Sequence, residues 1–131
     1  MIKKKPARDR KYLNWVKTLN CCVTGMPADD PHHVKGHGLG GTSTASDLFA
    51  MPMTRDIHTR FHSMGWQSFE KSHGSQIVFI AKTMGIAVKE GVKEAQEFYD
   101  EIDRFIFDED KIDTMKSIIE WYHNHGEMID V

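Results

Sequence analysis

Apolar residues recur along much of this chain at intervals of three and four, which is the spacing of an amphipathic helix. This pattern predicts helices over residues 10–19, 66–72, 76–84, 92–107 and 111–123. The longest of them carries its apolar residues at helical spacing: Ala95, Phe98, Tyr99, Ile102 and Ile106. Such stripes are far more often packing surfaces than ligand sites, so we interpret these helices as core-forming elements.

Two apolar segments are too short for a helix, and we expect both to be extended. Residues 32–34 follow Pro31, which removes one backbone donor and suits the start or the edge of a strand. Residues 48–53 form a second apolar run that contains a proline near its end. Between the two segments, the four glycines within residues 36–41 are typical of a loop.

One more helix is predicted directly after the second extended segment. Thr54 is a good N-cap, and the helical pattern that follows it continues until Gly65 interrupts it. The order of elements is therefore a helix, two short extended segments around a glycine loop, and a helix-rich C-terminal half. This order predicts an α+β protein that is mostly helical.

The length of the chain favours one domain. Its 131 residues, 40% of them hydrophobic, suit a single domain 1–131 with a modest core. Within it we distinguish a basic arm and helix (1–19), a central unit (20–66) and a helical C-terminal part (67–131). No apolar stretch approaches the roughly 20 residues of a membrane span, and the basic N-terminus runs into polar sequence. We expect a soluble, cytoplasmic protein without membrane contact.

The formal net charge of -2 conceals a gradient along the chain. Residues 1–17 carry a charge of +6, residues 18–85 are neutral overall, and residues 86–131 carry -8. A basic arm is typical of a segment that touches phosphates, although a short lysine run is as often a solvated tail. Because the last third is acidic, we expect any nucleic-acid contact on one side of the protein only.

Histidines are the most unusual feature of the composition, with eight in the chain and six of them between His32 and His73. His58 and His62 lie four residues apart on a predicted helix, so both rings can reach one metal ion. An isolated pair of this kind is more often two surface histidines. The motif lacks the glutamate that zinc peptidases use as a base, which sets that class aside. The other histidines have ordinary explanations, as a loop residue or as helix-end residues: His37, His73, His123 and His125.

The adjacent pair His32 and His33 changes the interpretation of the helical pair. Neighbours in a strand point to opposite sides, so one ring can bind a metal while the other stays free. A free neutral histidine near a metal-bound phosphate is what a hydrolase needs as general base. Three imidazoles leave an ion open positions and its full double charge, which suits phosphoryl chemistry. The alternative is a closed structural zinc site that takes a thiolate from Cys21 or Cys22.

Together these features resemble the HNH, or ββα-metal, nuclease finger, in an arrangement similar to that of the colicin-type DNases. Within that superfamily, CCVTG, PADDPHHVKGHGLGG, SD and FAMPMTRDIHTRFHSMGW look like small phage and prophage nucleases of the RecA-dependent Ref type. The resemblance covers about residues 20–66, and the helix from Arg10 extends it. It implies a ββα-metal finger with a short β-hairpin, packed against additional N- and C-terminal helices.

The resemblance also implies an activity and a set of site residues. It suggests a metal-dependent DNA endonuclease, phage or prophage encoded, with His32, His58 and His62 as metal ligands and His33 as general base. An exchange of roles between His32 and His33 stays open. Asp47 stands where the family has an Asn or Asp that orients the base, or else it forms an ordinary Asx turn. Zinc is the ion most expected, with manganese, nickel and magnesium as further candidates. Unlike many members, this chain has no CxxC pairs for a second zinc.

Three basic residues flank the histidines and are candidates for nucleic-acid binding, or else are simply solvated: Lys35, Arg55 and Arg60. DNA is the expected partner, and a recombination or replication protein is a possible second one. Two alternatives stay open. The first is a non-catalytic, zinc-finger-like module that binds nucleic acid or protein. The second is an interaction protein whose acidic C-terminal helices dock on a host factor.

Overall fold

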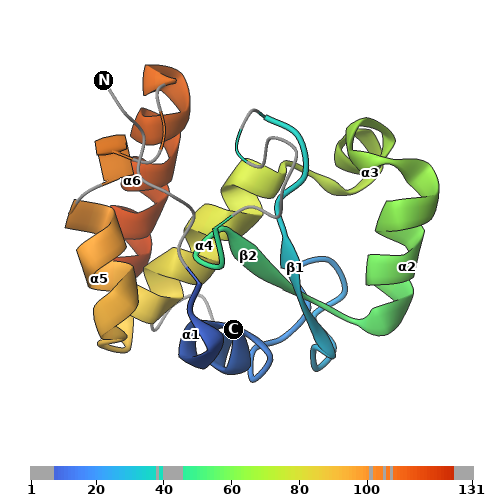
Figure 1. Cartoon of the computed structure of the whole chain (residues 1–131), viewed down its shortest axis with the longest axis horizontal. Coiled ribbons are helices and arrows are strands. Elements are labelled where there is room, and N and C mark those ends of the chain that lie inside the picture. The colour runs from blue at the N-terminus through green and yellow to red at the C-terminus, as the bar shows by residue number, and fades with distance from the viewer. Residues whose placement is uncertain are drawn as a thin grey trace.

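The computed structural model describes residues 8–37, 39, 46–100, 102–104, 106 and 108–125. Its elements in chain order are α1 (Arg10–Val16), β1 (Asp30–His33), β2 (Ala50–Met53), α2 (Arg55–Met64), α3 (Trp66–His73), α4 (Gln76–Lys89), α5 (Lys93–Asp100), the 3-10 turn η1 (Ile102–Arg104) and α6 (Glu109–His125). Figure 1 shows α2 and α3 on one side of the hairpin and α5 and α6 on the other, with α4 between them. The expectation of an α+β, mostly helical protein is confirmed.

Strands β1 and β2 form a two-stranded antiparallel sheet in which Pro31 lies opposite Pro52. Hydrogen-bonded and non-hydrogen-bonded pairs alternate along such a ladder. Because the N–H of Val34 bonds to the carbonyl of Phe49, the two prolines fall at a non-hydrogen-bonded pair. Neither missing N–H group therefore costs the ladder a bond. β1 covers residues 30–33 rather than the predicted 32–34.

Strand β2 begins at Ala50, two residues later than predicted. Leu48 and Phe49 are buried, but they lie in a turn that is closed by the bond from Phe49 N–H to the carbonyl of Ser46. An apolar run marks burial without distinguishing a strand from a buried turn, which is why the prediction began too early. The turn also carries Asp47, which lies in the middle of it.

Helix α2 begins and ends as the sequence predicts. The Thr54 side chain accepts a hydrogen bond from the N–H of Ile57 at 3.3 Å, which caps the first turn. Gly65, with a φ of +85°, separates α2 from α3. This left-handed conformation favours glycine and lets the chain change direction within one residue.

Helix α4 extends to Lys89, five residues beyond the predicted end at residue 84. Gly85 stands at the point where the prediction stopped, because glycine weakens a helix by about 1 kcal/mol relative to alanine. In the structure Gly85 lies against α6, where a Cβ atom would be 2.6 Å from the Cβ of Tyr122. The glycine is thus a contact point between two packed helices and does not end α4.

The prediction of one helix over residues 92–107 is wrong. α5 ends at Asp100, and the chain continues through the short turn η1. Ile102 and Ile106 are nevertheless buried together with Phe98. Their i, i+4 spacing correctly indicated burial, but that spacing is also compatible with a chain that leaves the helix and keeps the same apolar contacts.

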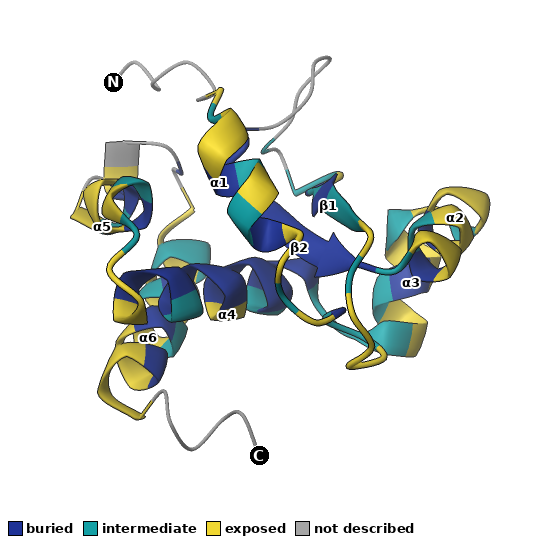
Figure 2. Cartoon of the chain, turned by 90° about the horizontal axis from the view of Figure 1, so that it is seen from below, coloured by how far each residue is buried: buried dark blue, intermediate teal, exposed yellow. Residues whose placement is uncertain are grey.

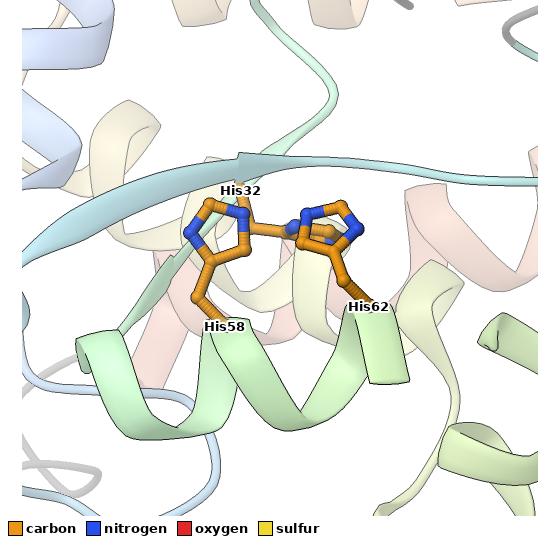
Figure 3. Close-up of side chains that lie close together, drawn as sticks. All are labelled: His32, His58 and His62. Atoms are coloured by element: carbon orange, nitrogen blue, oxygen red, sulfur yellow. The ribbon is translucent and has the colours of Figure 1, made fainter. Parts of the chain in front are cut away.

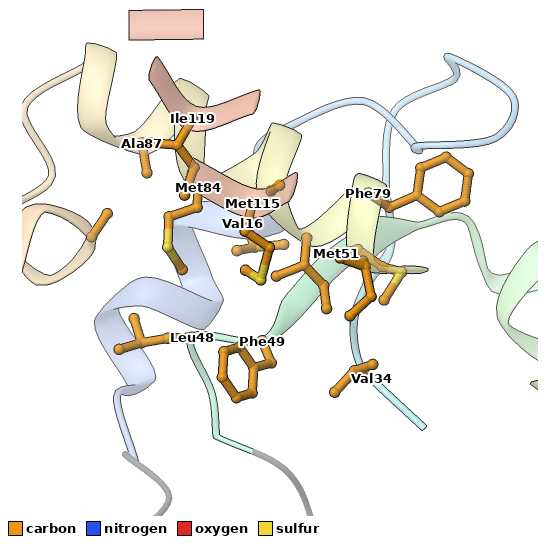
Figure 4. Close-up of a cluster of buried hydrophobic side chains, with 14 of the residues drawn as sticks. Val16, Val34, Leu48, Phe49, Met51, Phe79, Met84, Ala87, Met115 and Ile119 are labelled. Atoms are coloured by element: carbon orange, nitrogen blue, oxygen red, sulfur yellow. The ribbon is translucent and has the colours of Figure 1, made fainter. Parts of the chain in front are cut away.

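One apolar core joins the hairpin to the helices on both sides of it. Val16 of α1, Met51 of β2, Met84 of α4 and Ile119 of α6 are all at most 1% exposed and lie in the same cluster (Figure 4). Figure 2 shows the buried residues of β2 and α4 at the centre of the molecule and the exposed residues on its outer surfaces. The hairpin is therefore supported by packing on α4. No helix in the described part of the chain has the length and apolar character of a membrane span.

Candidate metal centre

Three histidines from two elements come together at the hairpin. His32 projects from β1, while His58 and His62 lie one turn apart on α2, and the rings point toward one another (Figure 3). One ring nitrogen from each lies within 4.8 Å of the others. The ring centroids of His32 and His58 are 4.9 Å apart, and those of His58 and His62 are 4.8 Å apart. Among the described residues, no other group of three histidine, cysteine, aspartate or glutamate side chains meets this condition.

His32 is the innermost member of this triad. Its side chain is 1% exposed, and its Nε2 atom is buried without a hydrogen-bond partner. Burial, with smaller contributions from the neighbouring His58 and His62, lowers the pKa of His32 to about 3. The pKa of His62 is also lowered, first by burial and then by His58. His32 is therefore neutral at physiological pH, which is the state in which imidazole binds a metal ion.

The donor set fits a divalent metal ion. An unpaired buried nitrogen costs about 1–3 kcal/mol, and a metal ion bound to Nε2 would remove that cost. Three imidazoles are a familiar catalytic donor set for zinc and leave a position open for water or substrate. Cys21 and Cys22 are free thiols that do not belong to the histidine group. The geometry therefore gives no support to a structural site that combines a thiolate with these histidines.

A carboxylate orients one of the three rings. Asp30 Oδ2 accepts a hydrogen bond from His58 Nδ1 at 3.1 Å, which directs the Nε2 lone pair of His58 toward the other rings. Asp30 Oδ1 accepts from the Arg55 guanidinium at 3.2 Å, and this bond is the main reason why the pKa of Asp30 is lowered. Asp30 lies two residues before His32 on β1, hence on the same face. The sequence interpretation missed it, although this spacing was a usable signal.

His33 points away from the triad, as expected for neighbours in a strand. Its Nε2 atom lies 2.8 Å from Asp47 Oδ1, and because a carboxylate can only accept, we assign the proton to Nε2. Nδ1 then carries the free lone pair. The His33 side chain is 20% exposed, so it remains accessible to solvent.

Asp47 contacts the residues just before α1 as well as His33. Its Oδ2 accepts the backbone N–H of Asp9 at 2.6 Å, directly before α1, and Arg8 lies 3.7 Å from its Oδ1. The carboxylate therefore joins β1 to the start of α1. These contacts replace the simple Asx turn that was the alternative interpretation. Arg8 belongs to the basic arm, whose first seven residues lie outside the described part of the chain.

The three predicted nucleic-acid-binding residues lie in different places. Lys35 is exposed and follows β1, three residues after His32 and two after His33, and its positive charge is a minor contribution to the lowered pKa of His32 and of His62. Arg55 reaches the triad through Asp30. Arg60 is exposed on α2, about 200° around the helix from His58, so it lies on the other side of α2 from the histidines.

A second polar group lies next to the site, and the sequence interpretation missed it. His37 Nε2 bonds to Glu70 at 2.6 Å and its ring packs on Trp66, so it is not a free loop residue. Gln76 bonds to both Glu70 and the backbone of Lys35. These partners are up to 41 residues apart, and no local pattern in the sequence connects them.

Comparisons with known proteins give a family but no activity. A family model described as "Protein of unknown function (DUF968)" matches residues 2–91. The chain is 47% identical over 83 residues to the "Uncharacterized protein YdfU" of Escherichia coli strain K12, a match that covers 63% of this chain and 24% of that protein. The chain thus spans about a quarter of the relative's length. No solved structure matches it significantly. Both the candidate centre and the Gln76–Glu70 group lie within residues 2–91.

Proposed function

This chain belongs to the DUF968 family, and we propose that it is a metal-dependent endonuclease that hydrolyses phosphodiester bonds of DNA. We further propose that residues 20–66 form a ββα-metal finger of the HNH type. One observation carries the proposal: the unpaired buried Nε2 of His32 lies in a histidine triad beside a separate histidine–carboxylate pair, His33 and Asp47. A set of metal ligands and a separate general base are the parts that metal-assisted hydrolysis requires.

We infer a role for each of these residues. His33 accepts a proton from the attacking water at Nδ1, while Asp47 holds the Nε2–H and stabilises the imidazolium that forms. The water oxygen bonds to phosphorus, and the bond from phosphorus to the leaving sugar oxygen breaks. A divalent ion held by His32, His58 and His62, most simply zinc, would polarise the phosphoryl oxygen and stabilise the charge on the leaving oxygen. Manganese, nickel and magnesium are further candidates.

The histidine–carboxylate pair favours catalysis over the alternative of a non-catalytic, zinc-finger-like binding module. Such a module needs metal ligands but has no use for an accessible histidine oriented by a buried carboxylate. We propose DNA as the substrate, and a recombination or replication protein as a second partner, on the sequence resemblance alone. The proposed place of action is the cytoplasm.

Nicking of a supercoiled plasmid tests the proposal. The purified protein is assayed with EDTA and then with zinc, manganese, nickel or magnesium, beside His33→Ala and His123→Ala variants. His123 is an exposed histidine of α6 and serves as the matched control. We expect metal-dependent nicking, a loss of at least 100-fold in His33→Ala and no change in His123→Ala. Full activity in His33→Ala would contradict the mechanism. Tight zinc binding without nicking under any condition would favour the binding module.

A further inference from the structure

Gln76, the first residue of α4, has a completely buried side chain that pairs with the backbone of a single residue. Its Oε1 accepts the N–H of Lys35 at 3.0 Å, and its Nε2 donates to the carbonyl of Lys35 at 2.8 Å. The carboxamide thus contacts Lys35 at two points, as a neighbouring strand would. A buried amide is costly unless it is paired, so this contact holds both partners in place.

Glu70 determines the orientation of the amide. Its Oε2 accepts from Gln76 Nε2 at 3.0 Å and from the Gln76 backbone N–H at 3.3 Å. Because a carboxylate only accepts, the amino group of Gln76 must face Glu70, and the amide oxygen then faces the N–H of Lys35. We call Gln76 and Glu70 together the Lys35 clamp.

The residues after Lys35 are held by the same group. Glu70 Oε2 also bonds to His37 at 2.6 Å. Between Lys35 and His37, Gly36 adopts a φ of +78°, and a Cβ atom there would lie 2.3 Å from a Trp66 ring carbon. The chain leaving β1 is therefore fixed against α3 and α4 over three consecutive residues. This fixation directly follows the strand that carries His32 and His33.

We propose that the Lys35 clamp positions the Lys35 ammonium to bind a substrate phosphate at the end of the strand that carries His32 and His33. The inference rests on the proposed function and adds a phosphate contact with its two positioning residues, Gln76 and Glu70. Lys35 has an exposed side chain and forms no ion pair within the described part of the chain. An exposed lysine whose backbone is fixed two residues after the proposed base His33 is suited to contact a phosphate of the substrate.

Salt-dependent DNA binding tests the clamp without any need for cleavage. Lys35→Gln, Gln76→Met and the double variant are made in a His33→Ala background, and their affinity for a labelled 20-base-pair duplex is measured with zinc at several salt concentrations. The slope of log K against log salt is negative, and loss of one phosphate contact reduces its magnitude by about 0.9. We expect this loss in Lys35→Gln, a comparable loss in Gln76→Met, and no further loss in the double variant. Zinc affinity stays within twofold in all three.

Matched controls separate positioning from stability and from overall charge. Gln67→Met on the exposed side of α3 and Lys93→Gln on α5 are expected to keep the parental slope. If Gln76→Met does not fold by circular dichroism, Glu70→Ala replaces it and is compared with Glu97→Ala, which removes the same charge from an exposed site.

The clamp would be overturned by an unchanged slope in Lys35→Gln, by an unchanged slope in the Gln76 or Glu70 variant, or by additive losses in the double variant. A His33-containing protein that never nicks DNA while its variants show the expected slopes would refute only the proposed endonuclease. Absence of measurable duplex binding in the parent would refute the clamp.

Discussion

Two carboxylates orient histidines at the candidate centre, one in the triad and one outside it. Asp30 orients His58 in the triad, and Asp47 holds His33 on the other side of the strand. The first pair would support metal binding, because the hydrogen-bond partner of a ligating histidine sets its tautomer and its basicity. The second pair suits proton transfer. Each carboxylate therefore has a separate measurable role.

Removal of Asp30 should weaken metal binding without abolishing the fold. We expect Asp30→Ala to lower zinc affinity by about 10- to 100-fold, because His58 loses the acceptor that directs its Nε2 lone pair toward the triad. Calorimetric titration with zinc measures the change. Asp29→Ala is the matched control, since the Asp29 carboxylate bonds to the N–H of Arg55 and to no triad histidine. Equal zinc affinity in Asp30→Ala and the parent would contradict this role.

Arg8, in the described part of the basic arm, lies close to the carboxylate that holds the proposed base. Its guanidinium lies 3.7 Å from the Asp47 oxygen that also bonds to His33. We expect Arg8→Gln to lower kcat/KM for plasmid nicking about tenfold, because Asp47, which holds His33, loses one charged contact. Arg10→Gln removes the same charge from an exposed position two residues later and should stay within twofold of the parent. Equal losses would mean that only overall charge matters.

At the scale of elements, local signals predicted structure well and distant contacts did not. Thr54 and Gly65 bound α2 in the sequence as in the structure, because a cap and a left-handed turn are formed by neighbouring residues. The alternation of His32 and His33 followed from strand geometry alone. The end of α5 was missed because the spacing of Ile102 and Ile106 indicates burial whether or not the helix continues. The Lys35 clamp depended on partners up to 41 residues away along the chain, so no periodic pattern could reveal it. Gly85 was misread for the same reason, since its partner Tyr122 is on α6.

The crossing of α4 and α6 can be tested at Gly85. In Gly85→Ala the new methyl group would lie 2.6 Å from the Cβ of Tyr122 and 3.3 Å from the Cα of Ile119, neither of which can rotate away. We expect the free energy of unfolding to fall by about 1–2 kcal/mol, because the overlap outweighs the better helix propensity of alanine. Urea denaturation measures it, with the exposed Lys82→Ala on the same helix as control. Zinc affinity should not change. A stabilised Gly85→Ala protein would contradict the close crossing.

At the scale of the whole molecule, the charge gradient along the sequence corresponds to an arrangement of the helices in space. The acidic last third contains α5 and α6, which lie across the molecule from α2 and α3, with α4 between them (Figure 1). The histidine triad is on the α2 side of this arrangement. The candidate centre therefore lies on the side of the molecule away from the acidic helices, and one-sided nucleic-acid contact stays a prediction.

A metal ion held by the triad would also link metal binding to the stability of the whole fold. His32 and His58 are 26 residues apart in the sequence, so their meeting requires the hairpin and α2 to be in place, and the unfolded chain has no equivalent site. Zinc at 100 times its dissociation constant should therefore add about 2.7 kcal/mol to the free energy of unfolding. For a chain of this length that corresponds to a rise in Tm of about 10 °C.

Thermal melts with zinc and with EDTA measure this shift. His58→Ala/His62→Ala should lose it, whereas His123→Ala/His125→Ala removes two exposed histidines of α6 and should keep it. A shift that persists in the first double variant would place the ion elsewhere. Absence of a shift in the parent would remove the basis for a metal centre, and with it the proposed hydrolysis, while leaving the hairpin, α2 and their apolar core unaffected. The melt is therefore the measurement to make first, because every catalytic role proposed here depends on its result.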